Sequence, residues 1–284
     1  MNRNILFSRM RHSYFFIIGL ITLCFLLFSC YIVPLWIDWD PETTSLLDRF
    51  IPPEGFSNGL KGHVLGTDSL GRDVLIRLLI GGQYSIRVAF ICVFLQMFVG
   101  AILGILAGYF GGWVDNVIMR ACDAFMSMPA LILAIAVMAI LGQSTRNLII
   151  VLTITGWVYL CKVTRNNVRV VKEQEFVLAS KALGTNGFDI MFRQIFPNVT
   201  TNIIILTSQS IGIIIILESG LSYLGLGIPP PTPSWGHMIS SGRMYLTTQP
   251  YLTLVPGFAL MLAVLSFNFM GDGIRDVLDT KRKK

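Results

Sequence analysis

Val88–Phe110 reads VAFICVFLQMFVGAILGILAGYF and contains no charged side chain from one end to the other. The hydrocarbon core of a bilayer is about 30 Å thick, and a helix of about 20 apolar residues crosses it. This stretch is therefore long enough to form a transmembrane helix. The same test selects four more uncharged runs and one shorter apolar run, which are Tyr14–Ile37, Ala124–Thr145, Gln194–Leu217, Met244–Gly271 and Asn147–Cys161. The sequence predicts six transmembrane helices.

The composition of the whole chain agrees with a membrane protein. Its 284 residues are 54% hydrophobic and only 13% charged, whereas soluble domains carry about 25% charged residues. So few charges cannot solvate the surface of a folded chain of this length. The composition excludes a soluble enzyme, a disordered protein and a disulfide scaffold, and it predicts an all-α, polytopic membrane protein.

The distribution of basic residues predicts the orientation of the helices. With the N-terminus inside, 15 of the 22 Lys and Arg side chains lie on the inner side, as the positive-inside rule requires. Both termini are then cytoplasmic. The predicted segments are a cytoplasmic N-terminus (1–13), a first transmembrane helix (14–37), an external loop (38–87), a five-helix core (88–271) that includes a cytoplasmic loop (162–197), and a basic cytoplasmic tail (272–284).

Several residues carry expectations about packing. Within the external loop, the apolar stretch Asp73–Ile80 is interrupted by Arg77, a pattern that is typical of an interfacial helix leading into the second span. Pro129 lies inside the third predicted span and could kink it. Trp235 follows a proline-rich stretch and is expected to anchor an outer loop at the membrane interface.

The second predicted span contains a stripe of small residues, Gly100, Gly104 and Gly108. Such stripes let helices approach closely in lipid, where apolar burial does not drive helices together. We prefer a partner helix within this chain to one in a second chain, because most helix contacts are internal.

The predicted cytoplasmic loop contains two sets of residues at the i, i+3, i+4, i+7 spacing of one helix face. The first set is Phe176, Ala179, Ser180 and Leu183, and the second is Phe188, Met191, Phe192 and Ile195. Gly184 and Gly187 lie between the two sets and break the helix. Pro197 is expected to end the second helix.

The first of these two helices has features of a docking surface. Ala179, Ser180 and Ala182 are small, so the backbone of another protein can approach closely, and Leu183 is large enough to fill a pocket. A helix hairpin that lies on the membrane surface fits the same pattern. The periodicity alone does not separate these two interpretations.

The loop also carries a recognisable motif. Glu175–Gly184 reads EFVLASKALG, and Pro197 follows thirteen residues later. This segment resembles the EAA loop of the permease subunits of ABC importers, although Leu178 and Ser180 stand where that loop has Glu and Ala. In that family the loop forms a coupling helix, which docks into a groove of the ATPase subunit. The resemblance implies that coupling depends on Glu175, Ala179, Ser180, Ala182, Leu183 and Gly184.

Further motifs extend the resemblance to the end of the chain. They are LGTDSLGRD (65–73), GYFGGWVD (108–115), ESGLSYLGLG (218–227), PPTPSWG (230–236) and FNFMGDGIRD (267–276). Together they resemble the C-type permease subunit of dipeptide, oligopeptide and nickel importers. The resemblance implies the type I ABC importer permease fold in a bacterial inner membrane.

The same resemblance implies a set of partners. They are a sister permease that completes a heterodimer, two P-loop ATPase subunits, an extracytoplasmic solute-binding protein and membrane lipid. Peptides are the implied substrates, and nickel or another chelated metal is the alternative. No nucleic-acid partner and no cofactor are expected.

Glu218 is the acidic residue placed well inside an apolar stretch. A charged side chain at the centre of a bilayer costs about 2.5–3.5 kcal/mol on insertion scales, so it rarely faces lipid. One interpretation is that Glu218 lines or gates the translocation path. The other is a buried structural acid that the glycine-rich backbone of Ser219–Gly227 caps.

Two other functional classes compete with a transporter subunit. A stand-alone secondary transporter often shows inverted repeats and charged groups near the membrane midplane, whereas this sequence has one off-centre Glu218 and no detectable repeat. A membrane-embedded enzyme would need a nucleophile–base set or a metal set within the spans, and the sequence shows neither. The motif of a phosphate-binding P-loop is absent as well, so ATP is expected to bind to other chains. His12, His63 and His237 lie far apart in sequence, so no metal site is expected. The sequence predicts a non-catalytic transport subunit.

Overall fold

The computed structural model describes residues 14–36, 40–54 and 62–278. The predicted N-terminal segment 1–13 and residues 279–284 of the predicted tail lie outside the described residues. The described chain is almost entirely helical. Its elements are α2 (Tyr14–Tyr31), η1 (Val33–Trp36), η2 (Leu46–Asp48), α3 (Val74–Phe110), α4 (Gly112–Met126), α5 (Ala130–Leu141), α6 (Thr145–Lys172), α7 (Glu175–Ala182), α8 (Gly187–Asp189), η3 (Ile190–Ile195), α9 (Phe196–Tyr223), α10 (Trp235–Gly242), η4 (Arg243–Tyr245) and α11 (Tyr251–Leu278).

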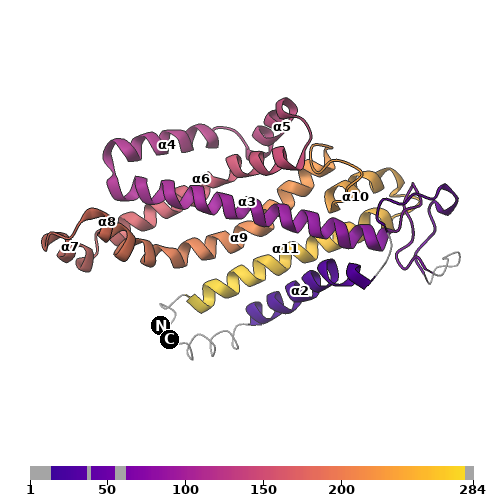
Figure 1. Ribbon diagram of the computed structural model, residues 1–284, viewed down its shortest axis with the longest axis horizontal. Helices are drawn as coiled ribbons and strands as arrows, with labels where there is room; N and C mark the ends of the chain where they lie inside the picture. The colour runs from indigo at the N-terminus through magenta and orange to yellow at the C-terminus, as the bar shows by residue number, and fades with distance from the viewer. Residues whose placement is uncertain (1–13, 37–39, 55–61, 279–284) are drawn as a thin grey trace.

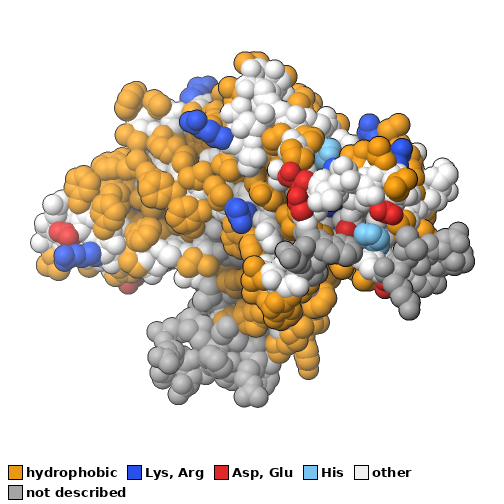
Figure 2. Space-filling view, turned by 45° about the vertical axis from the view of Figure 1, so that its right-hand side comes forward, with side chains coloured by type: hydrophobic (Ala, Val, Ile, Leu, Met, Phe, Trp, Pro, Cys, Tyr) orange, Lys and Arg blue, Asp and Glu red, His pale blue; other side chains and the backbone are white. Residues whose placement is uncertain are grey.

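The long helices lie side by side in one bundle, with α7 and α8 at one end and α10 at the other (Figure 1). We call these the α7 end and the α10 end. The start of α2 and the end of α11 both lie toward the α7 end (Figure 1). Hydrophobic side chains form a broad band across the visible face of the molecule, and acidic and histidine side chains lie mainly toward the α10 end (Figure 2).

Among the described residues, five helical segments are long and apolar enough to cross a membrane. They are Tyr14–Trp36, Val74–Phe110, Thr145–Lys172, Gly187–Tyr223 and Tyr251–Val277. The pair α4 and α5 passes the same test when taken together, but its two helices are bent by 84°. The predicted count of six is reached when this bent pair is one broken span.

The break between α4 and α5 contradicts the continuous third span expected over 124–145. The first helix ends at Met126, and Pro129 occupies the N-cap position of α5. Proline has no backbone N–H to donate, and it disfavours helical geometry in the residue before it. The helix therefore stops before Pro129 and restarts in a new direction, so the kink considered for this proline is a complete break.

The start of α3 also differs from the prediction. Residues 74–80 do not form a separate interfacial helix, because they are the first two turns of a continuous 37-residue helix. Arg77 is only 2% exposed, and Val74 and Leu79 are buried as well. At 1.5 Å per residue α3 is about 55 Å long, so it extends well beyond a hydrocarbon core. The helix therefore begins 14 residues before Val88, the residue at which the sequence predicts the second span to start.

The glycine stripe of α3 packs against α6 in the same chain. A Cβ atom added to Gly104 would lie 2.6 Å from the carbonyl oxygen of Cys161, and one added to Gly108 would lie 2.8 Å from that of Arg165. A Cβ atom added to Gly100 would likewise lie 2.8 Å from the carbonyl oxygen of Trp157. The preferred interpretation of an intrachain contact is confirmed, because only glycine allows this approach of the two backbones.

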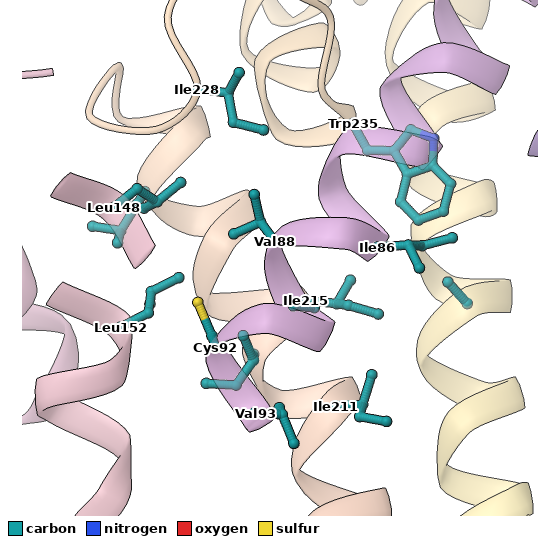
Figure 3. Close-up of a cluster of buried hydrophobic side chains, with 14 of the residues drawn as sticks. Ile86, Val88, Cys92, Val93, Leu148, Leu152, Ile211, Ile215, Ile228 and Trp235 are labelled. Atoms are coloured by element: carbon teal, nitrogen blue, oxygen red, sulfur yellow. The ribbon is translucent and has the colours of Figure 1, made fainter. Parts of the chain in front are cut away.

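The main core joins α3, α6 and α9. Side chains from these three helices meet in the cluster that Figure 3 shows, with Cys92, Leu152 and Ile215 among them. Trp235 belongs to the same core: it is 1% exposed, and its indole N–H donates a 2.9 Å hydrogen bond to the carbonyl of Leu78. The expectation of an interfacial anchor at Trp235 is wrong, since the side chain is buried within the bundle and its indole N–H bonds to a backbone carbonyl of α3.

Candidate functional site

The connection between α6 and α9 forms a helical hairpin at the α7 end. The prediction of two short helices around a glycine turn is confirmed, because α7 covers Glu175–Ala182 and a second helix begins at Gly187. The second helix does not end at Pro197. It passes through the π-helical segment η3 and continues as α9, in which Pro197 lies in the first turn.

The π-helical segment explains why Pro197 is tolerated. The N–H of Phe196 bonds to the carbonyl of Met191, five residues earlier. Proline cannot donate to the carbonyl four residues before it, and a π-helical turn shifts the bonding pattern at that point. The side-chain amide of Asn198 also donates to the Gln194 carbonyl at 2.6 Å. The helix therefore continues where the sequence predicts an end.

Gly184 ends α7 in a Schellman turn. The N–H of Thr185 donates to the carbonyl of Ser180, and the N–H of Gly184 donates to that of Lys181, each at 3.1 Å. Gly184 has φ +79°, the left-handed conformation that glycine adopts without steric cost. No atom would lie within 4 Å of a Cβ added there, so the turn itself and not crowding within the chain requires glycine.

The face of α7 that was predicted for docking is exposed. Leu183, at the C-terminal cap of the helix, is 86% exposed, and Phe176 is 42% exposed. The other candidate coupling residues Glu175, Ala179, Ala182 and Gly184 are exposed too, and Ser180 is half-buried. On the opposite side, Val177 is 3% exposed and packs in a core cluster with η3 and α9. The candidate residues therefore share one accessible surface.

Two contacts that hold the hairpin were not predicted from the sequence. The side-chain amide of Gln194 in η3 donates a 2.8 Å hydrogen bond to the hydroxyl oxygen of Ser180. Lys172, the last residue of α6, donates to the carbonyl oxygen of Tyr109 at 2.6 Å, and its ammonium lies 5.5 Å from the centre of the Tyr109 ring. Tyr109 also touches the hairpin, because a Cβ added to Gly187 would lie 2.9 Å from the tyrosine hydroxyl.

An ion-pair cluster joins α4 to α6 near this end of the bundle. Asp115 is 4% exposed. It accepts hydrogen bonds from Arg165 and, at 2.7 Å, from Arg169. A second pair, Lys162 and Asp123, joins the same two helices at 2.8 Å. Buried carboxylates need such partners. The sequence shows these charges but not their pairing, since 39 to 54 residues separate the partners.

Glu218 lies in α9 with no exposed surface. The hydroxyl of Ser222 donates to its Oε1 at 2.7 Å, and that of Ser219 lies 3.3 Å from its Oε2. Ser85 of α3 is also close to the carboxyl group. The partners are therefore serine hydroxyls and not the backbone of the segment that follows. In this conformation Glu218 has the environment of a buried structural acid.

A crevice at mid-bundle separates α9 from the bent pair α4 and α5. Its volume is about 310 Å³, and its walls are mostly apolar. The polar side chains in the wall are Gln96, Thr155, Tyr159 and Ser210, from α3, α6 and α9. Glu218 is not in this wall.

The geometry defines a polytopic membrane protein with an exposed helical hairpin at one end of its bundle. Residues 100–284 match the family of binding-protein-dependent transport system inner membrane components. The chain belongs to this family. It is a permease subunit of an ABC importer, a class of subunit that does not itself carry out catalysis.

Curated relatives agree with this family. The chain is 38% identical to the glutathione transport system permease protein GsiD of Pectobacterium atrosepticum, over 94% of this chain and 85% of that protein. It is 35% identical to the oligopeptide transport system permease protein OppC of Bacillus subtilis, over 97% of this chain and 88% of that protein. It is also 40% identical to the dipeptide transport system permease protein DppC of Alkalihalophilus pseudofirmus, over 80% of this chain and 76% of that protein.

A solved structure supports the fold. The chain resembles a chain of the MetNI methionine ABC transporter in inward-facing conformations with a TM-score of 0.58 at 18% identity. The match covers 70% of this chain and 95% of the other. The predicted type I ABC importer permease fold is confirmed.

Proposed function

We propose that this chain pairs with a sister permease to form the membrane path of an ATP-driven peptide importer. Two separate P-loop ATPase subunits would supply the energy, and an extracytoplasmic solute-binding protein would deliver the substrate. Membership of the family supports the general scheme. The arrangement at the α7 end supports the role of this chain within it.

The observation that carries this role is the exposed surface of α7. Leu183 projects at the tip of the hairpin and is 86% exposed, while the opposite side of the hairpin packs into the core through Val177. Burying an exposed leucine contributes about 1.5–3 kcal/mol. A large apolar side chain on a firmly attached helix fits a groove on another protein. We therefore assign this surface to the ATPase subunit.

The orientation of the chain follows from the same assignment. ATPase subunits bind nucleotide in the cytoplasm, so the α7 end would face the cytoplasm, as would the start of α2 and the end of α11. The excess of Lys and Arg on that side supports this orientation. Reporter fusions placed after Lys284 and within the loop 40–54 test it. A reporter active only in the cytoplasm should be active at the first position and inactive at the second.

Peptides are the proposed substrates. The three relatives are named for the transport of glutathione, oligopeptides and dipeptides, which share amide bonds and a free carboxylate. Nothing among the described residues favours nickel over these substrates. The mid-bundle crevice is the proposed contribution of this chain to the path, because its polar side chains can bind backbone amides while its apolar walls accept varied side chains.

The test is to purify the tagged chain from its native host in mild detergent and to measure the mass of the intact assembly. We expect one copy each of this chain and a second permease, together with two ATPases. After reconstitution with the solute-binding protein, the assembly should import a labelled dipeptide only when ATP is present on the ATPase side. A homodimer that transports without ATP would overturn the proposal.

A further inference from the structure

An open apolar groove lies between α2 and α11, in the half of the bundle toward the α10 end. Its volume is about 570 Å³, and pockets that hold small organic molecules measure about 300–1,000 Å³. The lining comes from the second half of α2, the first turns of α3 and the first half of α11, together with Leu65 and Trp235. All three helices belong to segments that are long and apolar enough to cross a membrane. Most of the groove therefore lies at the depth of the bilayer.

The groove exists because α2 changes neighbours along its length. Toward the α7 end its backbone touches that of α11, since a Cβ atom added to Gly19 would lie 2.6 Å from the backbone nitrogen of Met270. Toward the α10 end α3 holds α2, because the side-chain amide of Gln83 donates to the carbonyl of Cys30 at 2.6 Å. A Cβ atom added to Gly82 of α3 would likewise lie 2.6 Å from Sγ of Cys30. The space between α2 and α11 therefore narrows toward the α7 end.

The lining of the groove offers little to a polar ligand. None of the described residues that line it is charged. The hydroxyl of Ser29 donates to the carbonyl of Phe25 at 2.8 Å, and the indole N–H of Trp235 donates to the carbonyl of Leu78. The thiol of Cys30 belongs to a buried side chain, and the other side chains are aliphatic or aromatic. A peptide in this groove would leave its own N–H and C=O groups without partners, which is costly.

The edges of the groove are open to the surroundings of the bundle. Phe25 of α2 is exposed on one side, and Leu254 and Phe258 of α11 are exposed on the other, while Leu79 and Trp235 are buried. An apolar space of this kind does not hold ordered water. If it stayed empty, the side chains around it would lose dispersion contacts. Hydrocarbon is therefore the material that fits it.

We propose that this groove binds one acyl chain of a phospholipid from the membrane leaflet at the α10 end. A helix of another subunit is the competing apolar occupant, but a helix with its side chains is about 10–12 Å wide along its whole length. The groove narrows toward the backbone contact at Gly19, and a single acyl chain is thin enough to follow it. The bound chain would join α2 to α11 in the region where α3 holds α2.

The test uses the purified importer complex in phosphatidylcholine nanodiscs, with a small fraction of the lipid carrying a photoreactive diazirine on one acyl chain. After irradiation, mass spectrometry of the peptides locates the adducts. We expect adducts on Leu78, which lines the groove from α3. Ala259→Phe places a ring in the groove and should lower these adducts severalfold relative to adducts elsewhere on the chain. Leu265→Phe is the matched control, because it changes an exposed residue of α11 that does not line the groove, and it should leave the adducts on Leu78 unchanged.

A second measurement does not depend on a variant that folds. Cryo-electron microscopy of the unmodified complex in the same nanodiscs should show a thin tube of density in the groove that continues to a headgroup at the α10 end. Density for a helix of another subunit in the groove would overturn the proposal, as would a groove without density for a chain. Adducts on Leu78 that Ala259→Phe leaves unchanged would overturn it as well.

Discussion

The side-chain amide of Gln194 in η3 donates a hydrogen bond of 2.8 Å to the hydroxyl oxygen of Ser180 in α7. Ser180 in turn donates to the carbonyl of Phe176 at 2.9 Å, within α7. Since η3 continues directly into α9, this bond joins the exposed helix to a membrane-spanning helix. A displacement of α7 by a partner would therefore be passed to α9 and not absorbed by the loop.

Replacing Ser180 with alanine tests this connection. Ser180→Ala removes the acceptor of the Gln194 amide, and we expect a loss of about 1 kcal/mol in the attachment of α7. Dipeptide uptake should fall severalfold for each ATP hydrolysed by the reconstituted importer. Ser127→Ala is the matched control, because the Ser127 hydroxyl bonds only to the carbonyl of Ala124 in its own segment. Equal coupling ratios in the two variants would contradict the connection.

Leu183→Asp should detach the ATPase subunits from the purified complex. The change places a carboxylate in the apolar pocket that we propose for Leu183, and burying a charge without a partner is costly. The amount of ATPase that co-purifies measures the effect. Leu47→Asp is the control, since Leu47 is 98% exposed and lies in η2, far along the sequence from α7. Full co-purification of the ATPases with Leu183→Asp would show that Leu183 is not an anchor.

Substitutions of Gly184 test two requirements separately, the backbone conformation of the turn and the space that a docking partner needs around it. Gly184→Val should abolish uptake, because a β-branched residue cannot adopt φ +79° without strain. Gly184→Asn tolerates this conformation better, so it should retain more ATPase binding than the valine variant. Gly184→Trp should also abolish transport, by blocking docking while the chain still inserts into the membrane. Normal uptake by the tryptophan variant would contradict the coupling role of this turn.

Local patterns in the sequence predict most of the helices. The predictions that fail concern features that depend on contacts or backbone geometry outside the local pattern. The spacing around Ala179 predicts α7, and the stripe through Gly104 predicts a close helix contact. The helix end predicted at Pro197 is wrong because the π-helical segment before it shifts the hydrogen-bonding pattern, so the helix continues although proline has no N–H to donate. The interfacial position predicted for Trp235 is wrong because the indole N–H bonds to the carbonyl of Leu78, which is 157 residues away in sequence.

In the candidate site, too, features within one helix are predicted from the sequence, whereas contacts between different elements are not. Periodicity places Leu183 and its neighbours on one surface, because they lie within a single helix and its cap. The contacts that hold this surface in place, between Gln194 and Ser180 and between Lys172 and Tyr109, join different elements. Periodicity carries no signal for such pairs. The carboxyl group of Glu218 likewise lies close to Ser85 in α3, and no local pattern connects these two residues.

Gly187 and Tyr109 offer a test of the contact between the hairpin and α3. In Gly187→Ala the new methyl group would lie 2.9 Å from the tyrosine hydroxyl, so the hairpin or the ring must shift. We expect reduced uptake per ATP hydrolysed. Adding Tyr109→Phe removes the hydroxyl and should restore uptake toward that of Tyr109→Phe alone. An effect of Gly187→Ala that is the same with and without the hydroxyl would show that this contact does not transmit movement.

Substitutions of Glu218 distinguish between a structural role and a proton-carrying role of its carboxyl group. Glu218→Gln keeps the volume and an oxygen that accepts from Ser222, so we expect an assembled importer with unchanged ATP and pH dependence of uptake. Glu218→Ala leaves a cavity and serine hydroxyls without their acceptor, which should cost about 2–4 kcal/mol and lower the Tm by several degrees. Melting curves of the two variants beside the unmodified complex measure this difference. A well-assembled Glu218→Gln variant that loses uptake, or loses only its pH dependence, would instead place the carboxyl group in the transport mechanism.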